Sequence, residues 1–86
     1  MLTEKEGESA CSEIEAWGNR VAGRLDPKVA VQVYYDGDSS TYVLRVVKGS
    51  RVLLFRLSEA QVRSPGRGAE CERTLERKVK DLWNLI

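Results

Sequence analysis

The fold is decided by the stretch VAVQVYYDGDSSTYVLRVVKGSRVLLFRL, which occupies residues 29–57. Apolar residues recur with a period of two over residues 29–35, 41–47 and 52–57, and this period is typical of β-strands. The segment between the first two runs is rich in Gly, Asp and Ser, and Gly49 and Ser50 separate the second run from the third, so tight turns are predicted at both places. The stretch therefore predicts a three-stranded antiparallel meander.

The two turns predict the strand register independently, and the two predictions agree. A four-residue loop over residues 37–40 and a two-residue loop over residues 49–50 place the larger apolar side chains on one face. These side chains are Val31, Val33, Tyr35, Tyr42, Leu44, Val46, Leu53, Phe55 and Leu57. Because side chains alternate between faces, a shift of one residue in either hairpin would destroy the agreement. We therefore expect this face to be buried.

The residues before the meander have the period of an amphipathic helix. The apolar stripe has members three or four residues apart, namely Ile14, Trp17, Val21 and Leu25. The helix is predicted to begin near Ser9 or Ser12, since Ser12 and Glu15 can form a capping box, and to end before Pro27. Mid-helix glycine costs about 1 kcal/mol relative to alanine, so we expect Gly18 to permit close approach of a neighbouring element.

A second helical pattern follows the meander. Residues 58–63 predict one capped helical turn, residues 64–68 predict a break, and residues 69–86 predict a helix. The stripe of that helix contains Cys71, Leu75, Val79, Leu82 and Ile86. Trp83 lies beside the stripe, where we expect its indole N–H to stay in water.

The order of elements is thus α-β-β-β-α. We expect an α+β fold, a two-layer sandwich in which both helices pack on one face of the three-stranded meander. A chain of 86 residues suits one small domain. The predicted organisation is a flexible acidic N-terminal tail over residues 1–8 and a single α-β-β-β-α domain over residues 9–86.

Composition and residue types favour a non-catalytic protein that acts in the cytoplasm. Apolar residues make up 42% and charged residues 31%, no run approaches the length of a membrane span, and no signal peptide is apparent. Histidine, the commonest general base and transition-metal ligand, is absent. Asp36 and Asp38 are interpreted as turn residues rather than a calcium loop. Cys11 and Cys71 are expected to be reduced thiols. We therefore predict no enzyme activity, no cofactor, no metal and no membrane association.

The second face of the sheet is predicted to be unusually apolar for an open face. Such faces usually carry polar residues, and contiguous exposed apolar patches mark interaction sites. The alternative explanation is that β-branched residues simply form good strands on a half-wet surface. We favour a protein-interaction domain that binds a protein partner or a second copy, packed sheet to sheet. Its predicted site residues are Tyr34, Val43, Arg45, Val47, Val52, Leu54 and Arg56.

The charge distribution leaves nucleic-acid binding as an alternative. Residues 1–19 contain five Glu and one Lys, a charge of −4, whereas the whole chain carries +1, so residues 20–86 carry +5. An asymmetric charge of this size can steer an anionic partner. The candidate nucleic-acid-binding residues are Arg20, Arg24, Lys28, Arg67, Arg73 and Arg77.

The order α-β-β-β-α, with Gly66-Arg67-Gly68 leading into the second helix, is similar to the double-stranded-RNA-binding domain. The resemblance covers most of the chain, as topology. That family sets lysines at the start of its second helix, and the matching stretch here is Ala69-Glu70-Cys71-Glu72-Arg73. Arg67 and Arg73 are the basic residues near that position. The resemblance implies a nucleic-acid-binding module.

Overall fold

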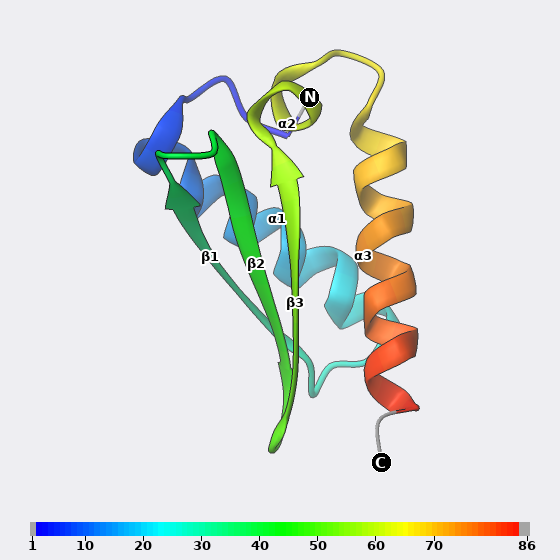
Figure 1. Cartoon of the computed structure of the whole chain (residues 1–86). Coiled ribbons are helices and arrows are strands. Elements are labelled where there is room, and N and C mark those ends of the chain that lie inside the picture. Colours follow the sequence, from blue (N-terminus) through cyan, green and yellow to red (C-terminus); the bar gives the residue numbers. More distant parts are fainter. Residues whose placement is uncertain (1, 85–86) are drawn as a thin grey trace.

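Three antiparallel strands form one open sheet with helices before and after it, as predicted (Figure 1). The computed structural model describes residues 2–84. The strands are β1 (Ala30–Asp36), β2 (Thr41–Lys48) and β3 (Arg51–Ser58), in that spatial order. The helices are α1 (Cys11–Leu25), α2 (Glu59–Arg63) and α3 (Gly68–Trp83), and a 3-10 turn, η1 (Gly7–Ala10), precedes α1. The last two residues of the predicted second helix lie outside the described residues.

The predicted strand register is confirmed. Val33 pairs with Leu44 across β1 and β2, and Leu44 pairs with Phe55 across β2 and β3. The turn into β3 places Gly49 at φ 61°, a left-handed conformation that glycine adopts without strain. The core lies between the inner sheet face and the helices. It contains Ile14, Val21, Val31, Tyr42, Leu44, Val46, Phe55, Leu57, Val62, Cys71, Leu75, Val79 and Leu82.

The helix α1 begins at Cys11, between the two predicted positions Ser9 and Ser12, but its capping differs from the prediction. No side chain caps the helix, and Ser12 is exposed. Glu15, which was expected to bond back to the cap, instead accepts a hydrogen bond from the main-chain N–H of Val33, at 3.1 Å. The predicted capping box is therefore wrong because the carboxylate is used by β1. The capped turn after β3 is confirmed, since Ser58 and Gln61 form a reciprocal capping box at the start of α2.

The N-terminal segment contacts the domain. The main-chain N–H of Leu2 donates to the carbonyl of Val62 at 2.9 Å, and the guanidinium of Arg63 lies 2.7 Å from the carboxylate of Glu6. Thr3 is buried and donates to the carboxylate of Glu13. These contacts tie the start of the chain to α1 and α2. The flexibility predicted for residues 1–8 stays a prediction.

A close contact between α1 and β1 confirms the expectation for Gly18. A Cβ atom added at Gly18 would lie 2.8 Å from Cγ1 of Val31, well inside normal van der Waals contact. Gly18 and Val31 are both buried. The absence of a side chain therefore lets the helix lie directly against the strand.

Asp26, immediately after α1, joins three parts of the molecule. Its carboxylate accepts a hydrogen bond from the indole N–H of Trp83 at 3.0 Å and lies 2.7 Å from the ammonium group of Lys48. It also accepts from the main-chain N–H of Lys28, at 2.9 Å. The expectation that the Trp83 N–H stays in water is wrong, because this carboxylate lies within its reach. Bonds from Lys48 and Lys28 lower the pKa of Asp26 to about 2.

Asp26 should therefore make the stability of the fold depend on pH in the acid range. The pKa falls from 3.8 to about 2 on folding, so the ionised carboxylate stabilises the fold above pH 4 and this contribution is lost as the pH falls through 2. We expect Asp26→Asn to be less stable than the native chain at pH 6 and to lose less stability on acidification. Urea unfolding between pH 6 and pH 2 measures both curves, and parallel curves would contradict the assignment.

Candidate protein-interaction surface

The outer sheet face contains the seven side chains predicted as the interaction site, and the structure brings all seven together. Across β1 and β2, Tyr34 pairs with Val43, and across β2 and β3, Arg45 pairs with Leu54. Helices cover the opposite face of the sheet (Figure 1). The whole predicted set is Tyr34, Val43, Arg45, Val47, Val52, Leu54 and Arg56. The predicted site is thus one continuous surface.

The members of the outer sheet face differ in exposure. Tyr34, Val52 and Leu54 are 50%, 37% and 56% exposed, whereas Val43 is only 5% exposed. Val43 lies outside the core cluster, and its cross-strand neighbours Tyr34 and Arg56 stand on either side of it. Val43 therefore forms the floor of the surface, which corrects its predicted role as an exposed contact. Sequence parity identifies the face but does not show which neighbours cover a side chain on it.

The arginines on this face are bonded within the chain. The guanidinium of Arg45 donates to Gln32 at 2.6 Å. That of Arg56 donates to Asp36 at 3.0 Å and to Thr41 at 2.8 Å. The bond from Arg56 also lowers the pKa of Asp36. Arg45 thus lies in the middle of the face, between Gln32 and Leu54, and Arg56 lies beside Val43; hydrogen bonds within the chain fix both guanidinium groups.

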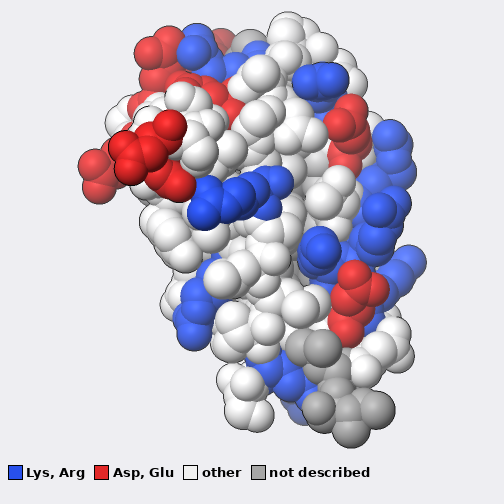
Figure 2. Space-filling view, viewed as in Figure 1, with Lys and Arg blue, Asp and Glu red and all other residues white. Residues whose placement is uncertain are grey.

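The distribution of charge agrees with this arrangement. Figure 2 shows uncharged surface over the strands that is crossed by basic side chains, with acidic side chains near the turn between β1 and β2. Charged side chains of both signs lie over α3 on the other side. Arginine and aromatic side chains are enriched at protein interfaces, and this face combines both with aliphatic residues.

Two polar side chains of α1, which the sequence did not single out, cover the free edge of β1. The side-chain amide of Asn19 donates to the carbonyl of Val31 at 3.0 Å and accepts from the N–H of the same residue at 2.9 Å. Glu15 accepts from the next outward N–H, that of Val33. Polar residues on a helix face are usually solvated, so spacing alone gives no signal for this role. Three outward main-chain groups of β1, the N–H and C=O of Val31 and the N–H of Val33, therefore have partners on α1.

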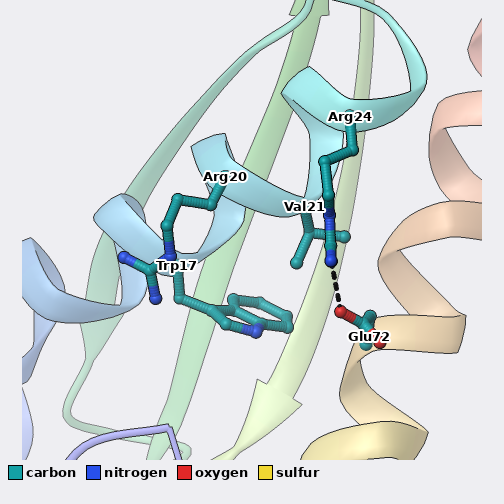
Figure 3. A pocket seen from close by; sticks show the side chains of 5 residues that line it. All are labelled: Trp17, Arg20, Val21, Arg24 and Glu72. Atoms are coloured by element: carbon teal, nitrogen blue, oxygen red, sulfur yellow. Dashed lines mark hydrogen bonds and ion pairs between the residues drawn. The ribbon is translucent and has the colours of Figure 1, made fainter.

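The predicted nucleic-acid-binding residues are distributed over the helices and their flanks. Arg20 and Arg24, on successive turns of α1, line a hollow of about 470 Å³ together with Trp17, Val21 and Glu72 (Figure 3). Arg24 is directed toward Glu72 of α3 and pairs with it. The others, exposed at the end of α1 or along α3 and its approach, are Lys28, Arg67, Arg73 and Arg77.

Acidic partners reduce the free positive charge of this set. Arg24 pairs with Glu72, and Arg67 lies 3.8 Å from Glu70. Arg73 and Arg77 are exposed one turn apart on α3. The structure brings Arg20 and Arg24 to one hollow, which Arg73 and Arg77 do not line.

The cysteines are free thiols. Cys71 is buried at the start of α3, where burial raises the pKa of its thiol, and burial likewise raises the pKa of Cys11. Raised pKa values disfavour the reactive thiolate. Among residues 2–84, no group of three or more metal-binding side chains is found, and no helix is long and apolar enough to cross a membrane.

No family model, curated protein or solved structure matches this chain. The likeness to the double-stranded-RNA-binding domain therefore rests on the order of elements alone. A shared architecture does not imply a shared function. Functional inference for this chain consequently depends on the chemistry of its own surfaces.

Proposed function

We propose that this chain is a non-catalytic protein-interaction domain that self-associates through the outer sheet face. One observation carries the proposal: within residues 2–84, three of the four exposed large hydrophobic side chains lie on this face. They are Tyr34, Val52 and Leu54, and the fourth is Trp83. Contiguous exposed apolar surface on a small domain is typical of an interaction site.

The energetics of burial support the same conclusion. Leu54, at 56% exposure, and Tyr34, at 50%, both have large apolar surface still to bury. Complete burial of a leucine or similar side chain contributes about 1.5–3 kcal/mol. Arg56 pairs with Asp36 and Arg45 donates to Gln32, so both guanidinium groups keep hydrogen-bond partners when another protein covers the face.

The substitution Leu54→Asp tests the proposal. A carboxylate at the centre of the interface would replace apolar contact with a charge that must be desolvated, so association should weaken by about 10- to 100-fold. Sedimentation equilibrium across a range of concentrations measures the change in associated mass. Circular dichroism should remain that of the native chain, because Leu54 makes no contribution to the core.

The matched control is Ala60→Asp, which adds the same charge at an exposed position on α2, away from the sheet face. Association should be unchanged in that variant. A native chain that stays monomeric at millimolar concentration would reject self-association. Equal loss of association in both variants would show an effect of net charge rather than of the outer sheet face.

Nucleic-acid binding is the second candidate. The observation that favours it is the hollow in which Arg20 and Arg24 border the indole of Trp17, since arginine beside an aromatic ring can hold a base and a phosphate. Binding of this kind would weaken steeply with salt, because each neutralised phosphate releases counterions. Fluorescence titration with a short RNA duplex at two salt concentrations measures it. The pairing of Arg24 with Glu72 leaves this candidate second.

A further inference from the structure

The two edge strands of the sheet, β1 and β3, differ in whether their outward main-chain groups have hydrogen-bond partners. In a hairpin with a two-residue loop, the residues flanking the loop exchange hydrogen bonds, and bonded pairs recur at every second residue. β3 therefore bonds β2 through the odd-numbered residues of 51–57. The main-chain N–H and C=O groups of Val52, Leu54 and Arg56 point away from β2.

The same alternation identifies the main-chain groups of β1 that do not bond β2. Continued across β2, it directs the main-chain groups of Val31 and Val33 outward, and these are the groups that Asn19 and Glu15 bind. No hydrogen bond from the described residues reaches the outward groups of β3. One edge of the sheet is therefore covered by α1, whereas the other is open.

The open edge has the character of a pairing template. β3 contains eight residues, without proline, and its register with β2 is continuous along the whole strand. Proteins commonly protect edge strands with proline, bulges, short length, charged side chains or a covering element. β3 has no proline and no bulge; it carries the exposed Arg51 and Arg56, and Arg51 donates to the carbonyl of Trp83 in α3. Of the three outward residues, Val52 and Leu54 are uncharged and Arg56 pairs with Asp36.

We propose that the β3 strands of two copies pair antiparallel about a two-fold axis at Leu54, joining the sheets edge to edge. This inference rests on the proposed self-association and places the contact at the β3 edge of the outer sheet face: Val52 and Leu54 would meet the second copy, whereas Tyr34, on β1, would lie away from it. Leu54 would lie opposite Leu54 of the second copy, and Val52 opposite Arg56. All three outward residues of each strand would then gain main-chain partners, and the exposed side chains of Val52 and Leu54 would gain cross-strand contacts.

The position of Arg56 favours a two-fold axis at Leu54 over an axis at Arg56 or at Val52. Moving the axis to Arg56 would place the two Arg56 side chains directly opposite each other, which is unfavourable. Moving it to Val52 would leave Arg56 without a facing strand residue. With the axis at Leu54, each Arg56 faces a valine and keeps its own partner Asp36, at 3.0 Å.

The inner side of the edge fits the same register. Leu53 is only partly buried, although it points toward the core side of the sheet. Pairing about Leu54 places Leu53 opposite Phe55 of the second copy, so this incompletely covered side chain would gain an aromatic neighbour. A second copy therefore complements both faces of β3 at once.

Amide hydrogen exchange followed by NMR tests the edge pairing. When roughly nine chains in ten are associated, exchange at Val52, Leu54 and Arg56 should slow by about tenfold, because these amides then exchange only from the dissociated chain. The amides of Leu53 and Phe55 are internal controls, since they already bond β2. Association with unchanged exchange at the three outward amides would overturn the edge pairing and leave the proposed function standing as face-to-face packing.

A proline substitution gives a second test. Leu54→Pro removes an outward N–H that β2 does not use, and proline is tolerated where the N–H of an edge strand faces solvent. It should weaken association by at least about tenfold relative to Leu54→Ala, which shortens the side chain and keeps the N–H. Equal association of the two variants, both folded, would reject the inference. A native chain with no association at any concentration would reject the inference and the proposed function together.

Discussion

Replacing Gly18 with alanine is expected to lower the free energy of unfolding by about 1–3 kcal/mol. Helix propensity alone would predict the opposite, because alanine favours the helix more than glycine does. The added methyl group would lie 2.8 Å from Cγ1 and 3.2 Å from Cβ of Val31. Val31 is β-branched, nearly fully buried and held at its main chain by Asn19, so it cannot turn aside cheaply. Either the side chain or the helix must move.

Gly23 provides the matched control, since it lies on the same helix and a Cβ there would meet nothing within 4 Å. Gly23→Ala should raise stability by about 0.5–1 kcal/mol through helix propensity alone. Urea unfolding of both variants measures the difference. The pair Gly18→Ala and Val31→Ala should show favourable coupling, because the smaller side chain relieves the contact. A stabilising Gly18→Ala would show that α1 does not depend on the close approach.

Replacing Asn19 with alanine is expected to cost about 1–3 kcal/mol, because it leaves the buried N–H and C=O of Val31 without partners. Asn19 is itself exposed, and substitutions at exposed helix positions usually change stability by less than about 0.5 kcal/mol. The expected loss therefore exceeds the ordinary effect of a surface substitution. It would identify the side-chain amide as the partner that completes β1.

Ser12→Ala is the control, since Ser12 is exposed on the same helix and makes no described side-chain hydrogen bond. Urea unfolding gives the stability of both variants, and amide exchange at Val31 reports directly on the edge. We expect faster exchange at Val31 in Asn19→Ala alone. Equal stability of the two variants would mean that water satisfies the β1 edge as well as the side chain does.

The register of the sheet could be predicted because two turns of different length point to one apolar face. Gly49 and the turn over residues 37–40 fix the alternation, and strand parity then places Tyr34 and Leu54 on the outer side. These are local properties of the chain. The fold and the membership of the outer sheet face follow from them.

Other features depend on how elements pack and could not be predicted in this way. Glu15 has the spacing of a capping residue, yet a main-chain N–H of β1 lies within its reach and takes the carboxylate. The exposed-looking Val43 is covered by cross-strand neighbours, and the indole of Trp83 reaches a carboxylate far away in the sequence. Each outcome is a competition between partners that only the folded chain brings together.

The covering of β1 by Asn19 and Glu15 has a consequence for how far assembly can proceed. A sheet with two open edges can add copies indefinitely and grow into a filament. In the proposed pairing, the next arrival would meet a β1 strand whose Val31 N–H and C=O and Val33 N–H are already bonded by α1. Growth in the direction of the sheet would then be disfavoured beyond one pair.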